Sequence, residues 1–237
     1  MDFLPNSTST EEADRGARIA VLPVGSFEQH GRHLPLATDT IVACAIAESI
    51  AKRYDLMLLP AITIACSHEH SDFNGTVSIS AATLYQVIRD VQGSLEQRGI
   101  RKLVLVNGHG GNYVLGNVVQ EANVGERRMA LFPHRDDWTQ ARKAGGLVTD
   151  NHEDMHGGEL ETSILLYVAP ALVREGFEQD DFVAPDRTHL HISGVAGYSA
   201  SGLIGRPSLA DSEKGRLVLE DLAASAAAHL NMLSGTD

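Results

Sequence analysis

The segment GSFEQHGRHLPLATDT, residues 25–40, concentrates carboxylates and imidazoles in one short stretch. Glu28, His30, His33 and Asp39 all lie within it. Such side chains bind catalytic Zn, Mn or Fe ions, whereas thiolates dominate structural zinc sites. Glu28 and His30 are two residues apart, so in an extended loop they point the same way. Each could hold a different ion, with Asp39 bridging the two ions from the start of the next helix.

Three later segments carry the same kinds of side chain. They are HEH (68–70), NGHGGN (107–112) with His109 at its centre, and HEDMHGGELETS (152–163). Taken alone, NGHGGN could equally be a tight turn whose glycines supply positive φ. An isolated histidine is more often solvated or locally hydrogen-bonded, which we expect of His134, His189, His191 and His229.

Apolar runs and amphipathic stretches alternate along the chain. We predict strands at 18–24, 56–65, 101–108 and 128–134. We predict helices at 39–54, 81–98, 112–124, 158–170 and 211–233. The alternation is typical of a mainly parallel sheet with helices on both faces, so the predicted fold class is α/β with three α/β/α layers. Because ligands bind at the carboxyl ends of parallel strands, the polar segments should meet at one rim of the sheet.

The length of 237 residues fits a single large domain. Residues 1–17 are polar and are expected to form a flexible tail, and residues 18–233 are expected to form one domain. The Gly-, Pro- and His-rich stretch at 176–208 is better interpreted as a long functional loop or an oligomer arm than as a domain boundary.

The composition excludes several classes of protein. A formal net charge of −12 argues against binding to a nucleic-acid backbone and weakens binding to anionic membranes. No stretch of 18 uninterrupted apolar residues is present, and residues 1–17 have no apolar core typical of a signal peptide. Cys44 and Cys66 lie in apolar surroundings and are expected to be core residues. A cytoplasmic enzyme or binding protein is therefore the default prediction.

The side chains at the predicted rim are of the types and number that a two-ion site needs. Two ions about 3.5–4 Å apart require a bridging carboxylate to offset their repulsion, and a hydroxide held between them is a nucleophile. The chain has no CxxC pair, so a metal would be catalytic rather than structural. The alternative is a metal-binding subunit without catalysis.

Three segments resemble the signature segments of the creatininase (creatinine amidohydrolase) family. They are LPVGSFEQHGRHLPLATDT, NGHGGN and HGGELETS, and FNGTVSIS (73–80) resembles a fourth. The resemblance covers roughly residues 20–230. It implies a three-layer α/β/α fold, a site for two divalent ions (Zn, Mn or Fe), and hydrolysis of non-peptide or small-peptide C–N bonds. It also implies a homo-oligomer, often a hexamer.

The resemblance assigns roles to individual residues. Glu28, His30, Asp39 and His109 correspond to metal ligands, with Asp39 bridging. His156 corresponds to the catalytic histidine, which would donate a proton to the leaving nitrogen. His33 follows the family pattern and is expected to support the site rather than to bind metal.

One position departs from the family pattern. Creatininase has a metal-binding glutamate two residues after the histidine of NGHGGN, where this chain has Gly111. We expect Glu161 to supply the fifth ligand, with Glu159 in reserve and otherwise acting as the acid/base partner of His156. His70, Gly110 and Gly111 are expected to contact the substrate.

The expected function is metal-dependent hydrolysis of a non-peptide or small-peptide C–N (amide) bond, with a cyclic amide or formamide as substrate, by a metal-bridging hydroxide. The glycine at position 111 argues against creatinine itself as the substrate. The family also contains a deformylase of a formylamino-pyrimidine and a peptidase that trims the mycofactocin precursor. A mycofactocin-type precursor peptidase is accordingly the alternative, and a non-catalytic metal-binding subunit is a further one.

Overall fold

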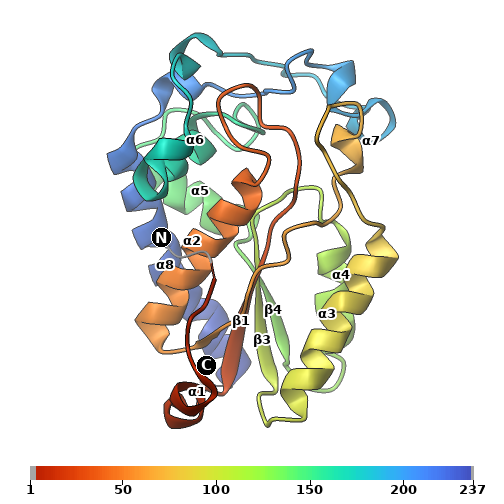
Figure 1. The fold of residues 1–237 in the computed structure, drawn as a ribbon, viewed down its shortest axis with the longest axis vertical. Helices are drawn as coiled ribbons and strands as arrows, with labels where there is room; N and C mark the ends of the chain where they lie inside the picture. Colours follow the sequence, from red (N-terminus) through yellow and green to blue (C-terminus); the bar gives the residue numbers. More distant parts are fainter. Residues whose placement is uncertain (1–3, 236–237) are drawn as a thin grey trace.

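The computed structural model describes residues 4–235 of the chain. Its centre is a parallel sheet of four strands in the order β2-β1-β3-β4. The strands are β1 (Ile19–Val24), β2 (Met57–Leu58), β3 (Lys102–Asn107) and β4 (Met129–Phe132). All four strands lie inside the predicted segments, and the predicted α/β fold class is confirmed (Figure 1).

The second strand is much shorter than the predicted strand at 56–65. It ends at Leu58, two residues before Pro60. Proline has no N–H to donate to a neighbouring strand, so it interrupts regular pairing at a sheet edge. Past the proline the chain still follows β1, since Ile62 N donates to Pro23 O at 3.0 Å and Gly25 N donates to Ile62 O at 2.9 Å.

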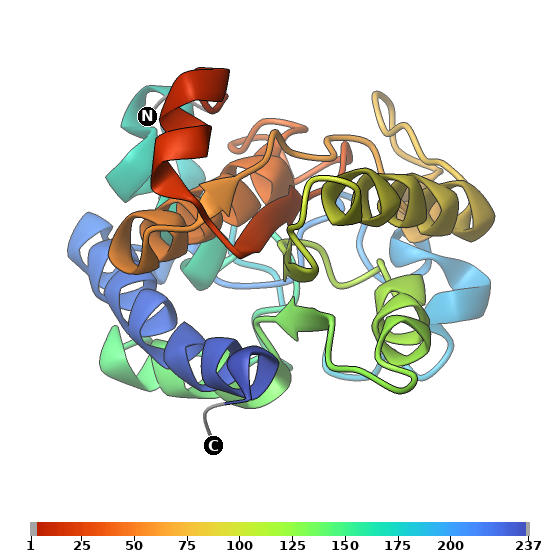
Figure 2. The ribbon, with the colours of Figure 1, turned by 90° about the horizontal axis from the view of Figure 1, so that it is seen from below.

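Helices cover both faces of the sheet. Figures 1 and 2 show one group on the left of the sheet and a second group on the right. The left group is α2 (Thr38–Tyr54), α5 (Arg135–Ala144), α6 (Glu159–Val168) and α8 (Ser212–Ser234). The right group is α3 (Ala81–Glu96) and α4 (Val114–Ala122). Of these helices only α5 was not expected, because the chain after Trp138 reads as irregular.

Alternation along β1 and β3 divides the core between the two helical layers. Val21 and Val104 belong to the cluster that contains α2, α6 and α8. Leu22 and Leu105 belong to the cluster that contains α3 and α4. Successive side chains of a strand point to opposite faces, so a sheet covered on both faces needs strands that are apolar throughout.

The segment expected as a flexible tail contains a helix, α1 (Ser9–Arg15). Thr8 and Glu11 form a capping box at its start, and Gly16 ends it in the left-handed conformation. These caps satisfy backbone groups that a short polar segment would otherwise leave to water. Part of the segment expected as a flexible tail is thus helical, at Ser9–Arg15, while residues 1–3 of that segment lie outside the described part.

Short helical turns and loops form the end of the molecule to which the strands point. They include α7 (Leu190–Ser193) and the 3₁₀ turns η1 (His68–His70), η2 (Pro170–Leu172), η3 (Phe177–Gln179), η4 (Val195–Gly197) and η5 (Pro207–Leu209). Across residues 4–235, none of the helices combines the length and apolar character needed to cross a membrane.

The core supports a stability prediction. Ile50 of α2 is fully buried in the cluster between the sheet and the left helical layer. We expect Ile50→Ala to lower the free energy of unfolding by about 2–5 kcal/mol, because it removes buried apolar surface and leaves a cavity. Urea unfolding measures this change. The control Val124→Ala, at a side chain that is 83% exposed, should change it by less than about 0.5 kcal/mol. Equal effects of the two substitutions would contradict this account of the core.

Candidate metal centre

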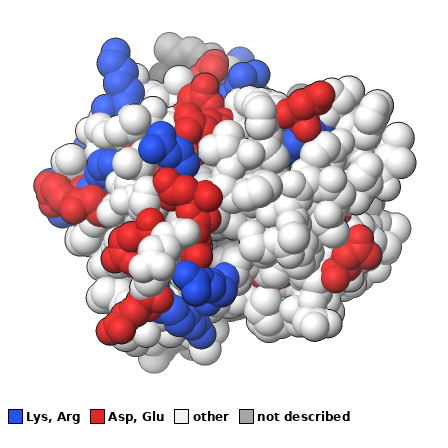
Figure 3. Space-filling view, turned by 90° about the horizontal axis from the view of Figure 1, so that it is seen from above, with Lys and Arg blue, Asp and Glu red and all other residues white. Residues whose placement is uncertain are grey.

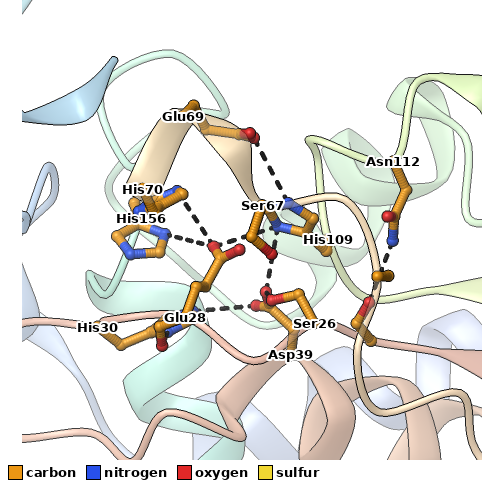
Figure 4. A network of polar contacts seen from close by, with 12 residues as sticks. Ser26, Glu28, His30, Asp39, Ser67, Glu69, His70, His109, Asn112 and His156 are labelled. Carbon is orange, nitrogen blue, oxygen red and sulfur yellow. Dashed lines mark hydrogen bonds and ion pairs between the residues drawn. The ribbon is translucent and has the colours of Figure 1, made fainter. Parts of the chain in front are cut away.

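Polar side chains from four segments converge at the carboxyl ends of the strands (Figure 4). They come from the connection between β1 and the first turn of α2, from the loops that follow β2 and β3, and from the segment that precedes α6. The buried members are Glu28, His30, Asp39, His70, His109 and His156. The polar segments thus meet at one rim of the sheet.

The first group of possible ligands is Glu28, Asp39 and His109. His109 Nδ1 lies 3.2 Å from Glu28 Oε1 and 3.1 Å from Asp39 Oδ2. Ligand atoms held about 2.0–2.2 Å from one ion, in tetrahedral or octahedral geometry, lie about 3–3.5 Å from each other. The measured distances are therefore those expected between ligand atoms that bind one ion.

The second group is His30, Asp39 and Glu161. His30 Nε2 lies 3.0 Å from Asp39 Oδ1 and 3.9 Å from Glu161 Oε1. Asp39 therefore presents one oxygen to each of these two groups, as a bridging carboxylate does, whereas a third possible group, Glu28, His30 and His156, does not include it. Ser26 Oγ donates to Asp39 Oδ2 at 2.5 Å, which fixes the orientation of the carboxylate.

Glu28 is the clearest sign that the cluster is built for a cation. Both of its carboxylate oxygens are buried and accept no hydrogen bond from the residues described. His70 Nε2 and His109 Nδ1 approach Oε1 to 3.1 and 3.2 Å without hydrogen-bond geometry. A buried carboxylate without hydrogen bonds is costly unless a positive charge compensates it. The residues present therefore fit a metal ion.

The pKa values in the cluster reflect the same demand for positive charge. Burial opposes protonation of His30, yet the Asp39 carboxylate, aided by Glu161 and Glu28, raises its pKa to about 10. Burial likewise opposes protonation of His109, but Glu28 and Asp39 raise its pKa well above the ordinary range. Burial raises the pKa of Glu161 to about 7. Metal cations can replace protons as the compensating charge at such a site.

Close backbone contacts explain why the loops can meet here. A Cβ on Gly108 would lie 2.3 Å from Asp39 O, so only glycine lets the loop after β3 approach the start of α2. Asn112 then ties three loops together: its Nδ2 donates to Gly25 O, and its Oδ1 accepts from Cys66 N, both at 3.1 Å. Asn112 had no predicted role, although its place at the end of NGHGGN was a usable signal.

His70 and His156 lie deep in the cluster rather than at its mouth. Gln29 Nε2 lies 2.9 Å from His70 Nδ1 and 3.1 Å from His156 Nε2. His70 is thus held between Gln29 and Glu28, so its side chain is engaged within the cluster, whereas we expected it to contact substrate. Gln29 was not predicted as a site residue, because an amide side chain is neither a typical metal ligand nor an acid/base group.

The environment of His156 defines what it can do. His156 Nε2 lies 2.5 Å from Gln29 O and 3.1 Å from Gln29 Nε2, an amide nitrogen that can only donate. The shorter contact, to the carbonyl oxygen, places the proton of a neutral ring on Nε2, and Nδ1 faces Glu28 Oε1 at 3.8 Å. Burial, together with His30 and His70, lowers the pKa of His156 well below its usual value. A neutral ring with a free Nδ1 is oriented as a proton acceptor or a ligand. Proton donation, the predicted role, requires that it first take up a proton.

The structure brings Glu161 to the cluster but not Glu159. Glu159 Oε2 accepts from Thr149 N at 2.9 Å and from Thr149 Oγ1 at 2.7 Å, and its Oε1 pairs with the Lys214 ammonium group. Residues two apart on a helix point in nearly opposite directions, which separates the two glutamates. Glu159 therefore links α6 to the loop at 148–149 and to α8. None of these hydrogen-bond partners belongs to the cluster of possible metal ligands.

His33 also lies outside the ligand groups. Its side chain is buried, with Nε2 at 3.1 Å from Thr162 Oγ1, and its carbonyl accepts from Arg174 N at 2.9 Å. The side chain thus packs the loop after β1 against α6.

One cleft, of about 310 Å³, reaches the cluster from the surface and is lined by Gly110, His109 and Glu161. A second cleft, of about 360 Å³, lies beside the cluster and is lined by Gly111, Glu69 and Tyr113. Figure 3, which looks down on this end of the molecule, shows charged side chains gathered on the left half and few on the right. Gly110 and Gly111 thus line clefts, as substrate-contacting residues would.

The comparisons with known proteins agree with one another. The family model described as creatininase, creatinine amidohydrolase, matches residues 5–230. A mycofactocin precursor peptide peptidase of Mycobacterium ulcerans is 34% identical, covering 92% of this chain and 86% of the relative. A creatinine amidohydrolase of Pseudomonas putida is 27% identical, covering 86% of this chain and 85% of the relative.

Solved structures show the same likeness. A creatininase described as the Mn form superimposes with a TM-score of 0.80 at 25% identity, covering 96% of each chain. A creatininase mutant described as the Zn-Zn type gives the same TM-score, identity and coverage.

The contacts of Glu159 predict a structural effect of its substitution. We expect Glu159→Gln to lower the free energy of unfolding by about 1.5–3 kcal/mol, because hydrogen bonds to a charged group are lost and Lys214 loses its partner. Metal content should not change. Denaturant unfolding and metal analysis test this, with Glu178→Gln, at an exposed glutamate, as the control. Loss of bound metal with unchanged stability would instead indicate that Glu159 belongs to the metal site.

The contacts of Glu159 also predict how its contribution to stability depends on pH. Burial would raise the pKa of Glu159, but hydrogen bonds from Lys214, Thr149 and Val148 outweigh it and lower the pKa below its ordinary value of 4.5. Because the folded-state pKa is the lower one, this stabilisation is complete above pH 4.5 and is lost as pH falls through the folded-state pKa. The stability difference between the wild type and Glu159→Gln should therefore shrink on acidification below pH 4.5.

Proposed function

This chain belongs to the creatininase family of metal-dependent amidohydrolases, and we propose that it hydrolyses an amide bond of a short peptide. The relatives support a peptide substrate. The mycofactocin precursor peptide peptidase is 34% identical over 232 residues, whereas the creatinine amidohydrolase is 27% identical over 225 residues. The substitution of glycine for a charged residue at position 111 also favours a substrate other than creatinine.

The division of the Asp39 carboxylate between two ligand groups is the observation that carries the proposal. Glu28, Asp39 and His109 would hold one divalent ion, and His30, Asp39 and Glu161 would hold a second. The solved relatives favour Zn or Mn, and the family resemblance adds Fe. Two such ions supply an activated water and polarise a carbonyl group.

The remaining residues of the cluster would position and protonate the reacting groups. His156, with Nδ1 free and Nε2 held by Gln29 O, would accept a proton and return it to the leaving nitrogen. Gln29 and His70 would hold the imidazole in this orientation, since the His70 and His156 ring centroids are 4.4 Å apart. The buried setting would exclude bulk water from these transfers.

Two further features remain predictions. A homo-oligomer, with a hexamer as one form, rests on the family resemblance, and a cytoplasmic location rests on the composition of the sequence. Sedimentation or light scattering of the purified protein would test the first.

The ligand assignment predicts the metal content of specific variants. The wild type should bind two divalent ions, His30→Ala about one, and Asp39→Ala neither, because Asp39 is shared. Metal analysis after dialysis against Zn or Mn measures this, with His189→Ala, at an exposed histidine, as the control. Chelation should abolish hydrolysis and added metal should restore it. Unimpaired hydrolysis by a His30→Ala, Asp39→Ala double variant would refute the mechanism.

The substrate class predicts the outcome of an activity screen. Short peptides, formamides and cyclic amides, creatinine included, are incubated with the metal-loaded enzyme, and released amine is measured. We expect release from peptides, and its loss in Asp39→Ala. Release only from cyclic amides or formamides would assign a different substrate, whereas metal binding without release from any of the three would favour a non-catalytic metal-binding subunit.

A further inference from the structure

The Glu69 carboxylate fills the space that a side chain at position 111 would need. A Cβ built on Gly111 would lie 1.9 Å from Glu69 Oε1 and 2.4 Å from His109 Nε2. Gly111 is not among the glycines with positive φ, so its backbone conformation alone does not require glycine. A side chain at position 111 would therefore have to displace the Glu69 carboxylate or the His109 ring, which now take this space.

Glu69 lies against the ring nitrogen of His109 that faces away from the ligand group. His109 Nδ1 faces Glu28 and Asp39, while Nε2 lies 2.8 Å from Cys66 O and 3.4 Å from Glu69 Oε1 (Figure 4). Nδ1 is thus the nitrogen free to bind an ion, and the proton belongs on Nε2. A metal-binding histidine whose other N–H faces a carbonyl or carboxylate is held in one tautomer and orientation, and its basicity is increased.

We propose that Glu69 is a positioning residue of the metal centre. Its carboxylate makes an ion-pair contact with His109 Nε2, beside the hydrogen bond from Nε2 to Cys66 O, and the absence of a side chain at position 111 leaves room for it. The inference rests on the proposed metal centre and adds to it a residue outside both ligand groups. Glu69 lies in η1, in the loop after β2, whereas His109 lies in the loop after β3. A residue of one loop thus contributes to the orientation of a ligand on the other loop.

Three variants test the proposal by metal affinity rather than by activity. Glu69→Gln keeps the size of the side chain and removes its charge. Gly111→Ala places a methyl group where the carboxylate lies. Asp72→Asn is the matched control, since Asp72 lines the same cleft and makes no described contact with His109. Affinity for Zn²⁺ is measured by competition with a chromophoric chelator, and the stability of the metal-free protein by urea unfolding.

We expect Glu69→Gln to weaken binding of one of the two ions about 10–100-fold, as for other groups that orient a ligand. Asp72→Asn should bind as the wild type does. Gly111→Ala should weaken binding too, and its effect should be smaller in a Glu69→Ala background, because the two single changes disturb the same contact.

Two results would overturn the inference. The first is wild-type affinity in Glu69→Gln, which would leave the proposed metal centre intact but remove Glu69 from it. The second is equal weakening by Glu69→Gln and Asp72→Asn, which would indicate a general effect of charge in the cleft. Absence of metal binding by the wild type is a different failure, because it would refute the proposed function itself.

Discussion

The arrangement of the site depends on one shared carboxylate, that of Asp39. Its two oxygens lie 3.0 Å from His30 Nε2 and 3.1 Å from His109 Nδ1, so two loops are oriented by a single side chain. Asp39 can serve both because it lies in the first turn of α2, where the helix N-terminus favours a negative charge. Ser26 further fixes the orientation of the Asp39 carboxylate by donating a hydrogen bond to Oδ2.

The parallel sheet makes this sharing possible. β1 and β3 are neighbours in the sheet and run in the same direction, so the loops that follow them leave the sheet side by side. Gly108 lets the backbone after β3 approach Asp39, and Asn112 joins that loop to Gly25 and Cys66. The side chains of the cluster are thus brought together by backbone contacts between the loops that carry them.

Much of this could be predicted from residue types and their order. The apolar run at 19–24 reads as a buried strand because strands covered on both faces are apolar throughout, and Glu28, His30 and Asp39 follow it directly. The second strand could not be placed as well, since Pro60 ends regular pairing while the chain still follows β1. The helix at Ser9–Arg15 was missed because its stability comes from caps rather than from an apolar face.

The sequence by itself determined the α/β fold class, the loops that carry the candidate metal ligands, and four of the five side chains in the two candidate groups, because local patterns reveal each strand and the polar residues that follow it. Only the tertiary structure separated Glu161 from Glu159, since that choice depends on the rotation of α6 against α8 and Lys214. Only the tertiary structure also showed that Glu69 fills the space beside Gly111, because the two residues are 42 positions apart and the contact exists only once the loops have met.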